Sequence, residues 1–273
     1  MTGVALGPRH SEVRRLRELL RDARARRAEG AFVVEGPRGI GAALDRGASL
    51  ESAYVGPGAA TAFAEVVARL ADTGVPVREL KDGVLERVGS TVTPQPVLAV
   101  ARAPHHDADA LAGDGIALVG VGLADPGNVG TLLRSAEASG AAGIVLGAGS
   151  VDAYNPKVVR ASAGAIFGVA LLEGWSVMDA LDAMRAAGRT CLGTRAAAGT
   201  PYHRADLAAS VAVVLGNEAH GVPADLEPAL DGWITVPMHP PAESLNVAMT
   251  GTLVCFEAAR QRAARADDAG ESS

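Results

Sequence analysis

Most apolar residues of the chain follow one of two spacings, that of strands or that of helices. Short apolar runs of strand length lie at 32–36, 53–55, 97–101, 116–123, 143–146, 168–172, 190–194, 211–215 and 234–236. Between several of these runs, apolar residues recur every three or four positions, as in amphipathic helices, most clearly at 61–72, 176–187 and 247–262. Alternation of strands and helices along a chain is typical of α/β proteins, and we therefore predict that fold class.

The length and the breaks in this pattern predict two domains. At 273 residues, the chain is longer than most single domains. The stretch 105–114 is polar and rich in residues that break helices and strands, which indicates a linker. It separates an N-terminal domain at 1–104 from a second α/β domain at 115–264. The acidic residues that follow, 265–273, are predicted to form a disordered tail.

Residues 9–29 form a strongly basic segment, with eight arginines against four acidic residues, a local charge of +4. Val13, Leu16, Leu19 and Leu20 recur at helical spacing, which predicts an amphipathic helix with a basic outer face. Such a face is typical of a solvated surface helix, but it also suits RNA, because arginine binds phosphate through two hydrogen bonds. The sequence leaves both alternatives open.

Composition excludes several classes of function. The net charge of −6 does not favour nucleic-acid binding by the chain as a whole, although phosphate contact needs only a local basic face. Cys191 and Cys255 lack metal-ligand spacing and fit buried, reduced thiols in a cytoplasmic protein. The histidines and aspartates at 105–109 are neighbours on a flexible segment, where side chains rarely converge on one ion, so we expect no metal. We also expect no signal peptide and no membrane span.

One loop at the end of a predicted strand combines glycine with two polar side chains. In the loop 123–134, Asn128 is placed to cap the following helix. Arg134 lies two turns into that helix, on the same side as Gly127 and Gly130. Ligands of open α/β sheets bind at the ends of strands, so this arginine is a candidate site residue.

Two further loops have the same character. Gly216 and Gly221 allow positive φ or close backbone approach, and they enclose Glu218. Ser244 and Asn246 stand at the start of a long predicted helix, where anions and polar ligands are favoured.

Together, these loops resemble the three motifs of the SpoU/TrmH family. The matching segments are Asn-x-Gly-x-x-x-Arg at 128–134, Gly-Asn-Glu-x-x-Gly at 216–221, and Val-Pro-Met with Ser-Leu-Asn-Val within 236–247. Members of this family are S-adenosylmethionine-dependent RNA ribose 2′-O-methyltransferases of the SPOUT class. The resemblance implies a C-terminal parallel-sheet SPOUT domain with a trefoil knot, assembled as a homodimer. Phe-Val-Val-Glu-Gly at 32–36 and Thr-Pro-Gln-Pro at 93–96 resemble the small α/β RNA-binding domain that often precedes it.

The resemblance also implies roles for individual residues. Arg134 matches the catalytic arginine of the family; because it stays protonated, it suits holding a phosphate and stabilising a developing alkoxide better than accepting a proton. The other predicted catalytic residues are Asn128, Glu218, Ser244 and Asn246. The predicted cofactor-binding residues are Gly216, Asn217, Val236, Met238, Leu245 and Thr194. The predicted RNA-binding residues are Arg38, Lys157 and Arg160.

Three functional hypotheses follow. The first is methylation of a ribose 2′-hydroxyl; the added N-terminal domain favours 23S ribosomal RNA as the substrate, and transfer RNA is the alternative. The second is a non-catalytic RNA-binding module, which the complete set of motif residues argues against. The third is a nucleotide-binding oxidoreductase, suggested by Gly120-Val121-Gly122 after a strand, but Asp125 stands where a dinucleotide fingerprint needs Gly or Ala.

Overall fold

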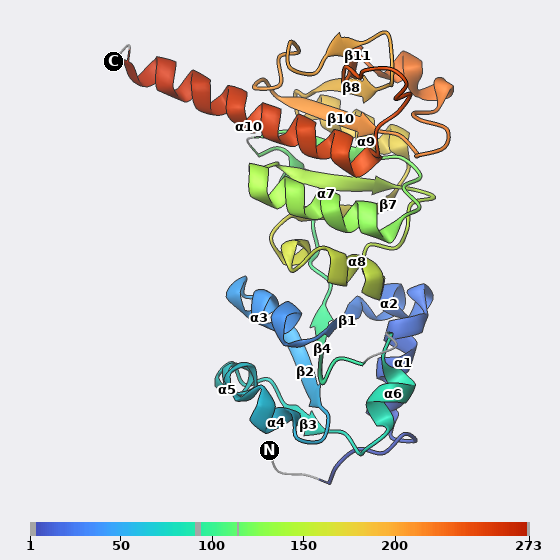
Figure 1. Cartoon of the computed structure of the whole chain (residues 1–273), viewed down its shortest axis with the longest axis vertical. Helices are drawn as coiled ribbons and strands as arrows, with labels where there is room; N and C mark the ends of the chain where they lie inside the picture. Colours follow the sequence, from blue (N-terminus) through green and yellow to red (C-terminus); the bar gives the residue numbers. More distant parts are fainter. Residues whose placement is uncertain (1–3, 91–93, 114, 272–273) are drawn as a thin grey trace. The chain divides into compact units, whose positions relative to one another are not determined.

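The chain folds into two compact units of α/β structure (Figure 1). This computed structural model describes residues 4–90, 94–113 and 115–271. The N-terminal unit comprises Met1–Pro104 and Tyr154–Phe167, and the C-terminal unit comprises His105–Ala153 and Gly168–Ser273. The division differs from the predicted one at a single segment. Residues 154–167 lie within the predicted second domain but belong by their contacts to the N-terminal unit.

The N-terminal unit is built on a four-stranded sheet of order β1-β4-β2-β3. Its strands are β1 (Ala31–Glu35), β2 (Leu50–Val55), β3 (Val77–Glu79) and β4 (Val97–Arg102). Its helices are α1 (Ser11–Arg21), α2 (Ala23–Glu29), α3 (Pro37–Asp45), α4 (Ala59–Ala62), α5 (Ala64–Asp72), α6 (Val84–Val88) and α8 (Pro156–Ala161). Strand β4 pairs antiparallel with β1 and β2, whereas β3 pairs parallel with β2.

The single basic helix predicted at 9–29 is wrong in one respect, because it divides at Asp22. The Asp22 carboxylate accepts a hydrogen bond from the Arg24 amide at 2.8 Å and so begins α2. Part of the basic face is also used inside the unit. Arg15 pairs with Glu29 at 2.6 Å and with Glu51 at 2.7 Å, so its charge is already matched.

Aromatic packing explains why α8 joins the N-terminal unit. The Phe32 ring on β1 is fully buried. It lies 4.7 Å from the Tyr154 ring and 5.7 Å from the Phe167 ring, which flank α8. Aromatic pairs at such distances stabilise the fold by more than the apolar area that they bury. The cluster takes three of the nine Phe, Tyr and Trp residues of the chain and links β1 to the segments on both sides of α8.

The C-terminal unit contains a seven-stranded sheet of order β7-β6-β5-β10-β8-β11-β9, and every pairing in it is parallel. Its strands are β5 (Ala117–Gly120), β6 (Gly143–Gly147), β7 (Ala170–Trp175), β8 (Thr190–Thr194), β9 (Thr200–Pro201), β10 (Val211–Leu215) and β11 (Gly232–Thr235). Its α-helices are α7 (Pro126–Ser139), α9 (Val177–Ala186) and α10 (Val247–Glu271). The predicted α/β class with a parallel sheet is confirmed; the trefoil knot stays a prediction.

The parallel pairing places the predicted loops at one edge of this sheet. Leu215 at the end of β10 is in register with Gly120 at the end of β5. Strand β11 runs parallel to β8, which itself pairs parallel with β10. The chain therefore leaves β5, β10 and β11 at the same edge, which is where open α/β sheets bind ligands.

The stretch predicted as a linker, 105–114, is tied down by one buried arginine. Arg189 is only 3% exposed. Its guanidinium donates to the carbonyls of Leu111 at 2.7 and 2.9 Å, Gly113 at 2.6 Å, Gly115 at 2.7 Å and Val211 at 3.1 Å. Leu111 is itself buried. A buried guanidinium requires such acceptors, and here they come from a segment whose polar composition gave no sign of it.

The predicted disordered tail also differs from the structure. Helix α10 continues through Glu271, well into the stretch 265–273. Arg265 on this part of the helix pairs with Asp206 at 2.6 Å. Alanine and arginine favour helix, and this propensity prevails over the acidic composition on which the prediction rested.

We expect replacement of Arg189 by methionine to lower the free energy of unfolding by about 3 kcal/mol or more, because several buried carbonyls lose their donor. Urea unfolding of the full chain, followed by circular dichroism, measures the change. The matched control is Arg265→Met, which breaks an exposed ion pair and should cost less than about 1 kcal/mol. Equal effects of the two substitutions would contradict the role assigned to Arg189.

Candidate active site

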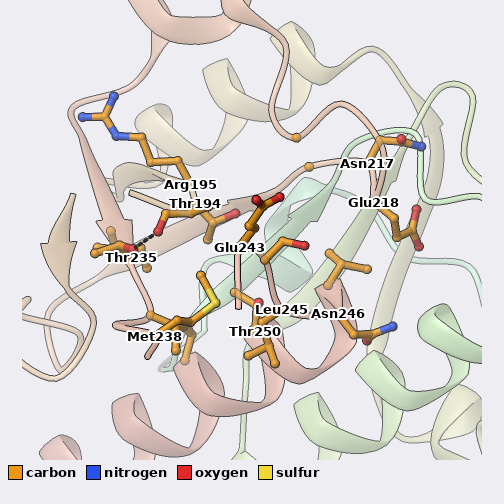
Figure 2. Close-up of a pocket in the computed structure, with 18 of the residues that line it drawn as sticks. Thr194, Arg195, Asn217, Glu218, Thr235, Met238, Glu243, Leu245, Asn246 and Thr250 are labelled. Atoms are coloured by element: carbon orange, nitrogen blue, oxygen red, sulfur yellow. Dashed lines mark hydrogen bonds between the residues drawn. The ribbon is translucent and has the colours of Figure 1, made fainter. Parts of the chain in front are cut away.

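The loops after β10 and β11 enclose one cavity in the C-terminal unit, with a volume of about 510 Å³ (Figure 2). Four segments line it: residues within 194–202, 216–221, 234–238 and 243–254. The cavity includes all six predicted cofactor-binding residues together with Glu218, Ser244 and Asn246. Asn128 and Arg134, which both lie on α7, do not line it.

The loop after β10 is a tight turn that only glycine permits at its first position. The Asn217 amide donates to the Gly221 carbonyl at 3.1 Å, and the Gly221 amide donates back to Asn217 at 2.8 Å. A Cβ on Gly216 would lie 2.0 Å from the Gly221 carbonyl carbon. Gly221 has φ +68°, a conformation that side chains disfavour. Glu218 is thus presented by a turn with little freedom.

Asn217 ties this turn to the neighbouring strand end. Its side-chain amide donates to the Gly122 carbonyl at 2.7 Å, and its side-chain oxygen accepts from the Ala219 amide at 2.9 Å. The Asn217 side chain therefore fixes the loop on both sides, besides lining the cavity.

Asn128 joins the other two motifs through its side chain. Its Nδ2 donates to Glu218 Oε1 at 2.6 Å, and its Oδ1 accepts from Asn246 Nδ2 at 3.0 Å. The Asn246 oxygen is occupied by the amides of Ala248 and Met249, so only its NH2 group is free to face Asn128. The Asn246 NH2 group therefore faces the Asn128 oxygen, which leaves the NH2 group of Asn128 towards the Glu218 carboxylate.

The predicted capping role of Asn128 is wrong. Asp125 caps α7 instead, accepting from the amides of Gly127 at 2.6 Å and Asn128 at 3.0 Å. Pro126 is the first residue of the helix, a position that proline favours, and this moves the cap to Asp125. At the start of α10, the Asn246 side chain accepts from the amides of Ala248 and Met249. The side chain of Asn128 is therefore free for the bridge between motifs.

Comparison with known proteins agrees with this geometry. Residues 115–256 match the SpoU rRNA Methylase family, and residues 10–99 match the MRM3-like substrate binding domain. The chain belongs to the SpoU rRNA methylase family.

Relatives within the SpoU family are similar over much of their length. The 23S rRNA (guanosine(2553)-2′-O)-methyltransferase RlmP of Bacillus subtilis is 34% identical over 68% of this chain and 73% of its own. The 23S rRNA (uridine(2479)-2′-O)-methyltransferase of Streptomyces viridochromogenes is 29% identical over 93% of this chain and 91% of its own. The crystal structure of the SpoU methyltransferase AviRb from Streptomyces viridochromogenes, in complex with the cofactor AdoMet, superposes with a TM-score of 0.83 at 28% identity, covering 93% of this chain and 99% of that one.

The arginine of the first SpoU motif lies apart from the cavity. Arg134 is exposed on α7 and makes no hydrogen bond or ion pair with any other described residue. An exposed guanidinium without a partner is available to bind an anion. Within one chain, the structure thus unites Asn128, Glu218 and Asn246 but leaves Arg134 outside the cavity lining.

Several cavity residues of this SpoU protein were not predicted. They are Tyr202, Glu243 and Thr250, which line the cavity beside the motif residues. Arg195, in the loop after β8, also lines it (Figure 2). Glu243 directly precedes the Ser-Leu-Asn motif, so its position was the one available signal. The charged side chains of the lining are Arg195, Glu218 and Glu243, which give one positive charge against two negative charges. This surplus of negative charge favours a cationic ligand.

Neither cysteine is suited to nucleophilic chemistry. Burial raises the pKa of the Cys255 thiol to about 11 and also raises the pKa of the Cys191 thiol. Among the described residues, no group of three or more His, Cys, Asp or Glu side chains is placed to hold a metal ion. No helix in the described part of the chain is long and apolar enough to cross a membrane.

The predicted RNA-binding residues lie together in the N-terminal unit. Arg38 is exposed in the first turn of α3, and Lys157 is exposed on α8. Arg160, one turn further along α8, pairs with Glu35 at 2.6 Å. Arg38 and Arg160 line a second cavity, whereas Lys157 does not.

We expect Gly216→Ala to open the turn after β10, because the added methyl group would overlap the backbone at Gly221. Hydrogen exchange followed by mass spectrometry should then show faster exchange of the Asn217 and Gly221 amides. The control is Gly232→Ala, whose Cβ would make an ordinary contact of 3.4 Å with Leu192. Unchanged protection in the Gly216 variant would contradict the close approach described here.

Proposed function

We propose that this chain transfers a methyl group from S-adenosylmethionine to a ribose 2′-hydroxyl of 23S ribosomal RNA, in the cytoplasm. The observation that carries the proposal is the side-chain bridge Glu218–Asn128–Asn246 beside the cavity, with one residue from each family motif. The 23S rRNA methyltransferases among its relatives support the choice of substrate.

The cavity fits S-adenosylmethionine in chemistry and in size. Its volume of about 510 Å³ lies within the range of small-molecule sites. Val236, Met238 and Leu245 provide apolar walls for the adenine ring, and the turn after β10 provides backbone groups. The surplus negative charge from Glu218 and Glu243 suits a ligand that carries a sulfonium and an ammonium group against one carboxylate. When bound, this cofactor supplies an electrophilic methyl group.

The chain itself must position the hydroxyl and stabilise charge on its oxygen. We assign the second task to Arg134, because a permanent cation favours the alkoxide and holds the adjacent phosphate. Asn128 keeps the Glu218 carboxylate in one orientation through its 2.6 Å hydrogen bond. Glu218, Ser244 and Asn246 then shape the wall of the cavity where the substrate enters.

A homodimer completes the proposed site. Arg134 does not line the cavity of its own chain, so a second copy is needed to bring the Arg134 guanidinium to it. Helix α10 carries an exposed apolar stripe of Met249, Leu253 and Phe256, which are 48%, 37% and 48% exposed. An exposed stripe at helical spacing marks a helix face that packs against another protein. We therefore propose that α10 faces a second copy of this chain.

We further propose that the N-terminal unit binds the RNA strand near its target. The match of 10–99 to a substrate-binding domain supports this role. Arg38, Lys157 and Arg160 provide the cations for phosphate contact.

Replacing Arg134 by alanine should lower methyl transfer at least about 10²-fold, because the developing alkoxide loses its stabilising charge. The assay is transfer of a radiolabelled methyl group from S-adenosylmethionine to a 23S rRNA transcript, with mapping of the modified ribose. Binding of S-adenosylhomocysteine should stay unchanged, and the control Arg265→Ala should keep its activity. Near-normal turnover of the Arg134 variant would show that this residue is not part of the site. Methylation of transfer RNA but not of the 23S rRNA transcript would refute the proposed substrate.

Replacing Met249 and Phe256 together by glutamate should convert the dimer into a monomer, because four like charges would be buried in its interface. Analytical ultracentrifugation measures the change in mass. The control is Met178→Glu, since Met178 on α9 is also an exposed apolar side chain, at 43%. A wild-type chain that sediments as a monomer at micromolar concentration would refute the proposed assembly.

A further inference from the structure

A second cavity, of about 450 Å³, lies wholly within the N-terminal unit. It is formed by the end of β1, the first turn of α3, Gln95 before β4, and α8 with the turn that follows it. Its volume is within the range of small-molecule sites. The side chains around it form a set that the methyl-transfer chemistry does not use.

One wall of this cavity holds a guanidinium in a fixed position. The Glu35 side chain is 2% exposed, and it accepts from Arg160 Nη1 at 2.6 Å and from the Ser90 amide at 3.1 Å. The same Arg160 nitrogen donates to the Ser90 hydroxyl at 3.0 Å. The other two nitrogens of Arg160 have no hydrogen-bond partner among the described residues. A buried carboxylate thus orients a cation whose remaining donors are free.

Gln95 places an uncommitted amide in the same cavity. Its side chain makes no hydrogen bond with any described residue, so both its donor and its acceptor are available. Gly36 makes room for it, because a Cβ there would lie 2.8 Å from Gln95 Oε1. Gly36 also begins α3 without a side-chain cap, and Ile40 is the first amide bonded back to it, at 3.1 Å. The preceding amides of Arg38 and Gly39 have no acceptor within the described chain.

The remaining surface of the cavity is apolar. Val34, Pro37, Pro156 and Val159 line it. The cavity therefore combines apolar walls, an amide with both hydrogen-bonding functions, and cationic donors at Arg38 and Arg160. A nucleotide requires these three features together, for the faces of its base, the edge of its base and its phosphate.

We propose that this cavity binds one unstacked nucleotide, with its base edge at Gln95 and its phosphate at Arg160 and the first turn of α3. The inference rests on the proposed function, because the nucleotide then belongs to a single-stranded part of the RNA substrate. It adds base recognition to the phosphate contacts proposed above. A free mononucleotide has the same chemistry, so the two sources must be separated by experiment.

The test uses the full chain saturated with S-adenosylhomocysteine, which blocks the adenine site in the C-terminal unit. The four nucleoside 5′-monophosphates and inorganic phosphate are titrated while the Arg38 and Gly39 amide resonances are followed by NMR. At least one mononucleotide should bind about tenfold more tightly than phosphate. A single-stranded RNA pentamer should bind more tightly than that mononucleotide and than a duplex of the same sequence. Equal binding of phosphate and all four mononucleotides, or preference for the duplex, would overturn the proposal.

Two variants and one control locate the ligand. Gln95→Leu and Arg160→Gln should each weaken mononucleotide binding about tenfold, whereas Arg78→Gln, an exposed arginine on β3, should not. Gln95→Leu leaves the Glu35–Arg160 pair intact, so it remains informative if the Arg160 variant fails to fold. Unchanged nucleotide binding in Gln95→Leu would refute the assignment.

The same variants separate this inference from the proposed function. In the methyl-transfer assay, Gln95→Leu should raise the KM for RNA with little change in kcat. Nucleotide binding without any RNA methylation would refute the proposed function and leave the cavity assigned. Methylation with an unchanged KM in Gln95→Leu would refute the cavity and leave the function standing.

Discussion

The active site depends on a single side-chain amide at the start of α7. Asn128 donates to a carboxylate 90 residues away and accepts from an amide 118 residues away. An asparagine side chain has one acceptor and one donor group in a planar arrangement, so it can serve both partners only if their polarities are opposite. The backbone amides at the start of α10 settle this polarity by occupying the Asn246 oxygen. A helix cap in one motif thus determines how a carboxylate in another is presented.

The turn after β10 shows how backbone constraints support this arrangement. Gly216 lets the chain close on itself, and Asn217 fastens the closed turn to the end of the neighbouring strand. These two interactions together fix the position of Glu218. The two glycines of the motif therefore act on the site through the backbone, whereas Asn217 acts through its side chain.

Much of this protein was predictable from local pattern. The alternating spacings gave the α/β class and most strands, and the spacing of motif residues gave the family. Some predictions failed because of interactions between residues far apart in the sequence, and others failed locally. The polar composition of 105–114 concealed Leu111, because the arginine that holds this segment lies far along the chain at Arg189. The cap of α7 was a local error, since Pro126 already indicated that the helix begins one residue after Asp125. A cavity residue such as Tyr202 belongs to no motif, and only the folded structure shows that it lies beside the motif residues.

The placement of 154–167 has a consequence for how the protein is made. Among the residues that the structure describes, the aromatic rings next to Phe32 are those of Tyr154 and Phe167. Translation proceeds from the N-terminus, and domains generally fold as units as they emerge. Here the first unit cannot complete its core until β5, α7 and β6 have also left the ribosome. In the nascent chain, the apolar surface around Phe32 therefore stays uncovered while a substantial part of the second unit is synthesised.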